Sequence, residues 1–360
     1  MRALRSIHCF ACLLSLGPLT ALAVASDMET GARPWQMVIQ LDNDVIAGTD
    51  RGYTNGSRVA FLKEFDEAVV ENPIARGLYK LSGTDPDGPL HGLRHRGDGP
   101  TRFAWGFGLT QLMFTPADPK AASAPNGERP YAGWLGLEFS LHVKDSASVS
   151  SVTLAVGTTG SNSYAGDTQT WMHENVSDSP TFEGWDSQVP NEVTVNLNFD
   201  QKLRMIFLDQ SRHSPIGVDG YYEWGASVGN FRTDAYLGAL MRFGWNLPST
   251  FSTPRVQIGS YGHELFRSAD PQRPPFSILG FIGVRGSAVL HDITLDGPVF
   301  RNFDTGVRSE PFVGEFLYGF GLRYRHAELA VSHTFRSDEF SGQDKNHEFG
   351  SVLLRFNLPF

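Results

Sequence analysis

The sequence predicts an all-β fold, a transmembrane antiparallel β-barrel of about twelve strands with a short helix in one outer loop. Three observations support this prediction. Long segments alternate apolar with polar residues, the polar faces carry Arg and Lys, and the chain ends on a phenylalanine in phase with an apolar face. A soluble β-sandwich also alternates. Strands of about 9–11 residues or more, with charges on the second face, favour a membrane barrel with a wet interior.

The alternation is clearest in the segment 135–143, where every second residue is apolar and the residues between are glycine, glutamate, serine or histidine. Because successive side chains of a strand point to opposite faces, such a segment has one apolar and one polar face. Patterns of this kind predict twelve strands, at residues 35–44, 54–64, 102–113, 132–144, 149–159, 191–206, 220–230, 234–246, 276–291, 312–325, 327–336 and 347–358.

An even number of strands places both ends of the barrel on the periplasmic side. The tight links 145–148 and 325–328 then lie on that side. Two long links, 65–101 and 247–275, also fall there, although periplasmic turns are usually short. The first is expected to hold a short helix near Glu67–Leu81. The segments expected outside are 45–53, 114–131, 160–190, 292–311 and 337–346.

The two ends of the chain carry export and assembly signals. Arg2 and Arg5 precede an apolar run that closes on Ala-x-Ala sites, which predicts a signal peptide at 1–25 and a barrel domain at 26–360. The chain ends on Phe360, in phase with the apolar face of the last strand, which resembles the assembly signal of bacterial outer-membrane proteins. We therefore expect an outer-membrane location, engagement of the barrel assembly machinery, and a monomer.

Composition excludes two other classes of protein. The net charge is -9 at pH 7 and no basic stripe is present, which argues against binding to nucleic acid. After the signal peptide, no charge-free apolar run approaches the roughly 20 residues of a membrane helix. One of the longest runs, from Phe276 to Val284, stops at Arg285.

A polar cluster forms the end of the first predicted strand. Asp42, Asn43 and Asp44 come just before a loop, and Thr54 begins the next strand. Carboxylate and amide oxygens are ligands for a hard cation such as Ca²⁺. A polar hairpin tip is the alternative, because Asn, Asp and Gly are also turn residues. Adjacent Asn43 and Asp44 can act together only if the strand ends or bulges there.

A second cluster lies in the segment 164–174, where Asp167 is a candidate helix N-cap. In a helix that starts there, Gln169 and His173 are four residues apart and share a face. A histidine held by a neighbouring group can act as a general base, although a solvated surface histidine is the alternative. By the strand count, this helix, Asn43, Asp44 and Thr54 lie at one rim.

Together these motifs resemble the lipid A 3′-O-deacylases of the bacterial outer membrane. The matching residues are the pair Asn43-Asp44, the run Tyr53-Thr54-x-Gly56, the Gln169-x-x-x-His173 spacing, the segment Trp185-Asp186-x-Gln188, and Glu192. The resemblance implies that Asn43 and Asp44 bind calcium, that Thr54 and Gln169 support activity, and that His173 is the base. It also implies a substrate-binding lysine in the loop after the third strand, where Lys120 is the only lysine.

The implied reaction is a calcium-assisted hydrolysis of an acyl ester of lipid A, in which His173 activates a water molecule. Two rival functions remain open at this stage. One is an outer-membrane phospholipase with a serine nucleophile. The other is a porin or a lipopolysaccharide-binding barrel without enzyme activity, which a measured pore conductance without lipid hydrolysis would favour.

Overall fold

The structure is a computed structural model. It describes residues 35–44, 52–65, 73–82, 85, 87–89, 101–175, 180–210, 214–248, 250–251, 254–257, 275–325, 327–344 and 346–358. The predicted signal peptide and Phe360 lie outside the described residues.

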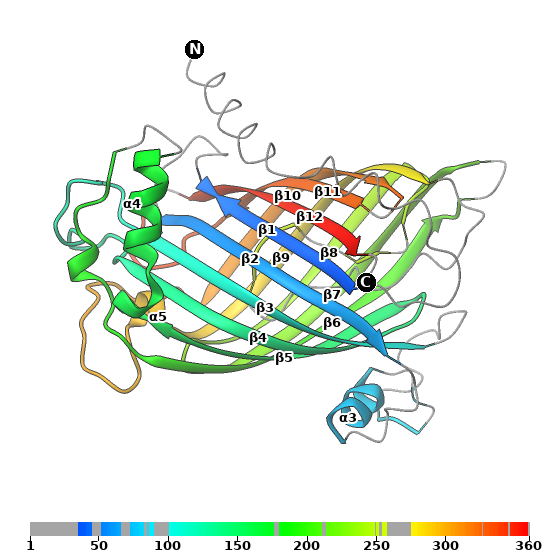
Figure 1. Cartoon of the computed structure of the whole chain (residues 1–360), viewed down its shortest axis with the longest axis horizontal. Coiled ribbons are helices and arrows are strands. Elements are labelled where there is room, and N and C mark those ends of the chain that lie inside the picture. Colours follow the sequence, from blue (N-terminus) through cyan, green and yellow to red (C-terminus); the bar gives the residue numbers. More distant parts are fainter. Residues whose placement is uncertain are drawn as a thin grey trace, which may run out of the picture.

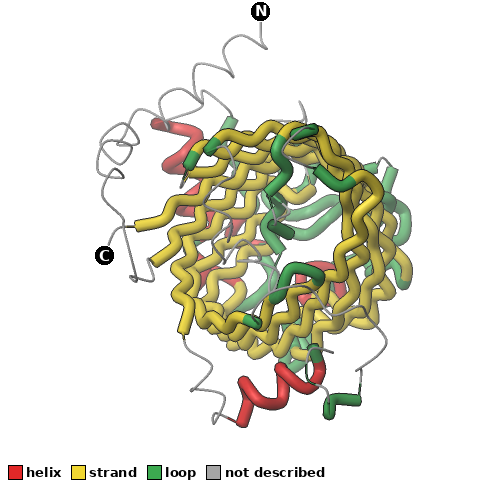
Figure 2. The backbone as a smooth tube through the Cα atoms, turned by 90° about the vertical axis from the view of Figure 1, so that its right-hand side faces the viewer, coloured by secondary structure: helices red, strands yellow, loops and turns green. Residues whose placement is uncertain are grey.

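Twelve antiparallel strands close into a barrel in which β1 pairs with β12 (Figures 1 and 2). The predicted strand number is confirmed, and the predicted boundaries differ from the observed ones by at most four residues. The strands are β1 (Trp35–Asn43), β2 (Gly52–Phe65), β3 (Arg102–Thr115), β4 (Ala132–Lys144), β5 (Ser148–Thr159), β6 (Val193–Leu208), β7 (Ile216–Gly229), β8 (Arg232–Trp245), β9 (Phe276–Asp292), β10 (Phe312–Tyr324), β11 (Ala327–Arg336) and β12 (His347–Leu358).

We call the end that carries the β1–β2, β3–β4 and β5–β6 connections the outer rim. The opposite end, where β1 starts and β12 ends, is the inner rim. Helix α4 (Ala165–Asn175) and the one-turn α5 (Ile293–Asp296) lie at the outer rim, and α3 (Pro73–Leu81) lies at the inner rim. Helix α3 confirms the described part of the helix expected near Glu67–Leu81, and residues 67–72 lie outside the described residues.

The N-cap prediction for the outer helix is wrong. Helix α4 begins at Ala165, so Asp167 lies in its first turn. A short 3₁₀ turn, Gly160–Ser163, precedes the helix, and Ser163 Oγ accepts from the Ala165 amide at 3.4 Å. The preceding 3₁₀ turn therefore sets where the helix begins. Asp167 in the first turn still places a negative charge near the N-terminus of the helix, where the helix dipole favours it.

The wall has an apolar outer face and a polar inner face. On β4, Leu137 and Phe139 are exposed on the outside, whereas Glu138 between them is fully buried inside. Glu138 pairs with Arg58 of β2 at 2.8 Å on the lumen side of β3. The predicted alternation is thus confirmed. Separately, no helix in the described ranges is both long enough and apolar enough to span a bilayer.

The connection between β8 and β9, for which the sequence offered no explanation, folds into the barrel. Its described residues in the range 246–257 lie inside the ring of strands, where Figure 2 shows loop segments. Phe251 is fully buried in a cluster with the inward-facing Tyr221 and Leu240. Lys202 Nζ donates to the Phe251 carbonyl at 3.1 Å, and Arg242 Nη2 donates to the Pro248 carbonyl at 3.1 Å.

The same segment reaches up toward the outer rim. Gln40 Nε2 donates to the carbonyls of Pro254 and Arg255, each at 3.0 Å, and the Val256 amide donates to Asp42 Oδ2 at 2.8 Å. Irregular backbone is tolerated at membrane depth only where protein or water satisfies its polar groups. The polar inner wall supplies those partners, and we call residues 246–257 the lumen segment.

The lumen segment predicts a barrel that does not conduct ions. The purified protein in a planar bilayer should show no stable single-channel steps, because the described residues of this segment bind the wall on several sides. Deletion of residues 250–257 should open a conductance, since it removes Phe251 and the carbonyls that the wall cations hold. Equal stepwise conductance in the parent and in the deletion variant would contradict this arrangement.

Candidate active site at the outer rim

The regular alternation of β1 stops at the candidate metal pair. Ile39, Leu41 and Asn43 occupy outward positions, and the residues between them are buried inward. The strand ends at Asn43, and Asp44 lies fully buried in a turn. Asp44 therefore lies just beyond the regular alternation of β1.

A β-bulge sets the direction of Thr54. The pairing of β2 with β3 shifts between Tyr53 and Asn55, so Thr54 is the extra residue. Its hydroxyl lies 2.6 Å from the hydroxyl of Thr115, which occupies an outward position of β3 in phase with Leu109. Thr54 therefore faces the outer side of the wall. Asn43 Nδ2 donates to the Thr54 carbonyl at 3.2 Å and joins the two strands there.

The inner side of the wall holds the bulge in place. The Tyr53 hydroxyl donates to Asp42 Oδ2 at 3.2 Å, and the Tyr53 amide donates to His347 Nε2 at 3.0 Å. Since an amide can only donate, His347 Nε2 is the acceptor and Nδ1 carries the proton. Nδ1 lies 3.3 Å from Glu339 Oε2, which fixes this tautomer.

Glu339 is anchored in turn by arginine. Arg129 Nη1 lies 2.8 Å from Glu339 Oε2, and Arg336 Nη1 lies 3.0 Å from Glu339 Oε1. Burial opposes ionisation of this carboxyl, but the two guanidinium groups hold the pKa of Glu339 well below its ordinary value. Glu339 is therefore ionised and remains an acceptor for His347.

Helix α4 packs on the outer face of the wall beside the bulge. Gln111 of β3 donates from Nε2 to the Ser163 carbonyl at 2.7 Å, and Met113 joins a buried cluster with Ala165 and Trp185. Both β3 residues occupy outward positions, so the helix covers the side of the barrel that faces away from the lumen. Figure 1 shows α4 across the outer-rim ends of the strands.

Gln169 lies between this helix and the wall with its side chain buried. Its Oε1 accepts from Trp185 Nε1 at 2.8 Å, while its Nε2 has no hydrogen-bond partner within the described part of the chain. A buried donor without a partner costs about 1–3 kcal/mol. The amide nitrogen of Gln169 is therefore available to a ligand.

His173 lies one turn further along α4 and is half-buried. Its Nδ1 lies 2.7 Å from the carbonyl oxygen of Pro180, and its ring contacts Phe182. Because a carbonyl can only accept, Nδ1 must carry the proton, and Nε2 of the neutral ring keeps its lone pair. The geometry thus makes Nε2 the basic atom of His173.

The predicted residues form two groups that meet through β3. Thr54, Asn43 and Asp44 are on one side of this strand, where Thr115 contacts Thr54. Gln169 and His173 are on the helix that contacts Gln111 and Met113.

Lys120 is exposed, and its ammonium group has no hydrogen-bond or ion-pair partner in the residues that the structure describes. Its loop contacts the segment after α4 through the Glu183 amide and the Pro119 carbonyl, at 2.9 Å.

The donor types at Asn43 and Asp44 are compatible with calcium. Within the described residues there is no group of three or more His, Cys, Asp or Glu side chains that could hold a metal ion. Asp44 would supply a full negative charge to such a site, and Asn43 would supply an amide oxygen. Calcium completes its shell with backbone carbonyls and water, so a site of this kind is possible here with one carboxylate.

The sequence comparison identifies the family. The sequence model of the outer membrane protein LpxR family matches residues 9–358. The chain belongs to this family. The resemblance drawn from the motifs is confirmed, and the protein is an integral outer-membrane barrel. No curated protein matches the sequence.

Solved structures agree on the fold. LpxR from Salmonella typhimurium aligns with a TM-score of 0.65 at 17% identity, over 90% of this chain and 100% of that chain. The β domain of the Bordetella autotransporter BrkA aligns with a TM-score of 0.42 at 10% identity, over 91% and 99%. The first of these shows that the fold is shared with a member of the family.

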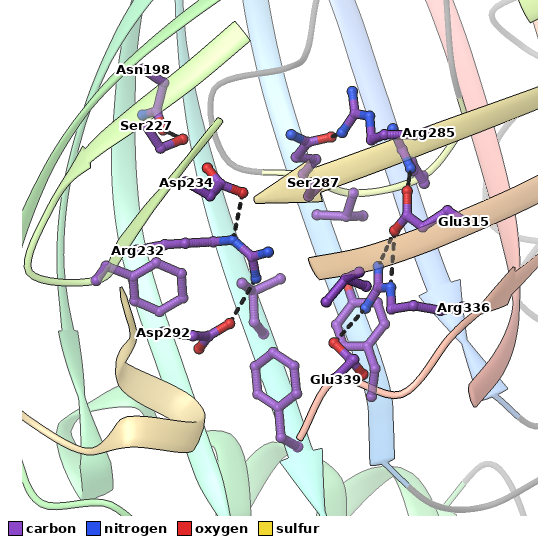
Figure 3. Close-up of a pocket in the computed structure, with 18 of the residues that line it drawn as sticks. Asn198, Ser227, Arg232, Asp234, Arg285, Ser287, Asp292, Glu315, Arg336 and Glu339 are labelled. Atoms are coloured by element: carbon purple, nitrogen blue, oxygen red, sulfur yellow. Dashed lines mark hydrogen bonds and ion pairs between the residues drawn. The ribbon is translucent and has the colours of Figure 1, made fainter. Parts of the chain in front are cut away.

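A cavity of about 110 Å³ inside the barrel is separate from this site (Figure 3). It contains none of the predicted site residues, and its charges are paired: Arg232 lies 2.8 Å from Asp234 and 2.7 Å from Asp292. Arg336 bridges Glu315 and Glu339 in the same way. This network of ion pairs supports the inner wall below the bulge. The predicted site residues on α4 and at Thr54 lie on the opposite, outer side of the wall.

Sequence reasoning missed two residues of the site. Thr115 is an ordinary strand-end residue in the sequence, and only the bulge brings it to Thr54. His347 lies 294 residues along the chain from Tyr53, whose amide donates a hydrogen bond to it. The pairing of β1 with β12 could have indicated that the start of β12 lies near the end of β1, but the bulge that needs His347 has no sequence signal.

His347 should be required for activity without touching substrate. His347→Ala removes the acceptor of the Tyr53 amide, so Thr54 should shift and hydrolysis of the lipid substrate should fall roughly 10–100-fold, as for displacements of about 1 Å. His347→Gln offers an acceptor oxygen and should recover much of the rate. The control is His333→Ala, on the neighbouring strand β11, which should act like the parent. Loss of folded, heat-modifiable barrel in parallel with activity would instead indicate a purely structural role.

Proposed function

We propose that the protein is a lipid A deacylase that hydrolyses a 3′-O-linked acyloxyacyl ester of lipopolysaccharide in the outer leaflet. Membership of the LpxR family supports this function. The observation that carries it is the position of the site: the strand end at Asn43 and the bulge at Thr54 present polar groups on the outer wall, under a helix with a basic histidine. A lipid ester reaches that side of the wall directly from the membrane.

His173 is the general base in this proposal. Its Nε2 takes a proton from a water molecule, and the water attacks the ester carbonyl. The tetrahedral intermediate then collapses, the acyl C–O bond breaks, the fatty acid leaves, and the imidazolium returns its proton to the alcohol oxygen of the leaving group. Pro180 holds the opposite ring nitrogen, so the imidazolium that forms keeps its orientation. A positioned base of this kind contributes roughly 100–10,000-fold to the rate.

Three further side chains bind and orient the substrate. The free Nε2–H of Gln169 donates to an ester or oxyanion oxygen in a site from which Trp185 excludes water. Thr54 holds water or substrate on the outer wall, and Lys120 pairs with a phosphate of lipid A. A calcium ion at Asp44 and Asn43, when bound, would polarise the ester carbonyl and stabilise the developing oxyanion.

Replacement of the base should remove hydrolysis and leave the barrel intact. His173→Ala should lower the rate of acyl release at least ~100-fold, because it removes the general base. The barrel should stay folded, because α4 lies outside the ring of strands that holds it closed. Mass spectrometry of lipid A incubated with the purified protein measures the product. Glu174→Ala, on the same helix, is the matched control and should keep the parent rate. Acyl release by His173→Ala at the parent rate would refute the assigned base.

The calcium proposal is tested with two neighbouring carboxylates. Chelation should abolish activity, calcium should restore it, and magnesium should do so poorly because it resists dehydration. Asp44→Asn should need far more calcium for half-maximal rate. Asp42→Asn should leave that concentration unchanged, since Asp42 faces the lumen and contacts Tyr53 and Val256. Full activity in excess chelator would exclude calcium, and equal requirements in the parent and Asp44→Asn would move the ion to other residues.

The rival functions give different results in the same assays. A phospholipase would release fatty acid from phospholipid vesicles that contain no lipopolysaccharide. A porin requires an open lumen, and the lumen segment argues against one. A barrel that only binds lipopolysaccharide would leave lipid A from producing cells identical in mass to that from cells without the protein.

A further inference from the structure

Helix α3 lies outside the barrel at the inner rim. In Figure 1 it lies below the inner-rim ends of the strands at the lower right, and in Figure 2 it lies beneath the ring rather than within it. Leu78 is buried in a cluster with Phe103 and Val143. Both partners occupy outward positions of their strands, in phase with the exposed Trp105 and Phe139. The helix is therefore docked on the outer wall.

A polar contact fixes the end of this helix. Gln201 of β6 occupies an outward position, and its Nε2 donates to the Ser82 carbonyl at 3.1 Å. The Trp224 indole nitrogen donates to Gln201 Oε1 at 2.9 Å, which orients the amide. Helix α3 thus covers the wall from β3 to β6 with both apolar and hydrogen-bonding contacts.

The position of α3 corresponds to the edge of the bilayer. On β3, Met113 lies under α4 and Phe103 lies under α3, ten residues apart. At ~3.4 Å per residue this is about 34 Å along the strand. A tilt of about 40° reduces it to about 26 Å along the membrane normal, close to the roughly 25 Å apolar band of such barrels. The inner rim also holds the short 145–147 turn, which is typical of the periplasmic side.

The exposed surface of α3 has an apolar part and a cationic part. Ile74 and Leu81 are seven residues apart and share one side of the helix, with 61% and 45% of their surfaces exposed. Arg76 and Lys80 are four apart and share another exposed side. The exposed apolar pair borders the side that faces the barrel, because Ile74 is four residues before the buried Leu78 and Leu81 is three residues after it. Arg76 and Lys80 lie on the opposite side of the helix.

We propose that α3 binds the periplasmic leaflet, with Ile74 and Leu81 in the acyl region and Arg76 and Lys80 on the phosphates of anionic phospholipids. Amphipathic helices of this pattern lie in the membrane interface. The apolar side continues the lipid-facing belt of β3 and β4, and the two cations project from a protein of net charge -9. This inference goes beyond the proposed hydrolysis and does not depend on it.

Site-directed spin labelling tests the arrangement. The only cysteines, Cys9 and Cys12, lie in the predicted signal peptide, so the mature chain provides a cysteine-free background. Ile74→Cys, Leu81→Cys, Arg76→Cys and Lys80→Cys are labelled singly and reconstituted in phosphatidylcholine vesicles with and without phosphatidylglycerol. Collisions with oxygen report the acyl region, and collisions with a nickel chelate report water. Leu137→Cys on the lipid belt and Arg301→Cys in an outer loop are the references.

Labels at positions 74 and 81 should resemble the Leu137 reference, and labels at 76 and 80 should resemble the Arg301 reference. With phosphatidylglycerol, labels at 74 and 81 should lie deeper, and Arg76→Gln with Lys80→Gln should remove that difference. Four equally aqueous labels, or labels at 74 and 81 shielded from both reagents by protein, would overturn the proposal. So would a depth that is independent of anionic lipid. Hydrolysis in detergent, which uses none of these residues, checks separately that each variant is folded.

Discussion

The pairing of every backbone group within the chain is the constraint on which this structure depends. The bilayer offers no water to unpaired amides and carbonyls, so strands can cross it only as a closed ring. Here β1 and β12 complete that ring, from Trp35 opposite Leu358 to Asn43 opposite Gly350. A regular ring sends side chains alternately to lipid and to the lumen. A lipid-modifying site therefore needs polar groups on the lipid side, which regular alternation does not provide.

The outer rim supplies such groups through two local departures from the regular strand. Strand β1 ends at the outward-facing Asn43, and the bulge in β2 turns Thr54 outward. The bulge has a consequence on the inner side, because the Tyr53 amide takes its hydrogen-bond acceptor from a histidine side chain. His347, Glu339 and the arginines of the inner cavity satisfy that requirement. The charged lumen thus supports a site on the opposite face of the wall.

The fold could be predicted from the sequence because period-two patterning is a direct consequence of strand geometry. The twelve strands follow from it. The lumen segment could not be predicted, since residues 246–257 have no periodicity and gain their partners only from wall residues far away in sequence, such as Gln40 and Asp42. The candidate site came from motif resemblance. The contacts of Gln169 with Trp185 and of His173 with Pro180 supply physical reasons that the motifs alone lacked.

Both helices outside the ring pack on the same strands, and this gives the barrel one distinctive side. Helix α4 covers the outer-rim end of β3 and β4, and α3 covers the inner-rim end, while Phe107 and Phe139 remain exposed between them. The depth of the barrel in the membrane sets the height of His173 relative to the ester bonds of lipid in the outer leaflet. A helix that contacts the opposite leaflet on the same strands would fix that height from below. In the proposed reaction, the position of His173 at one rim would therefore be coupled, through β3 and β4, to the proposed contact of α3 with lipid at the other.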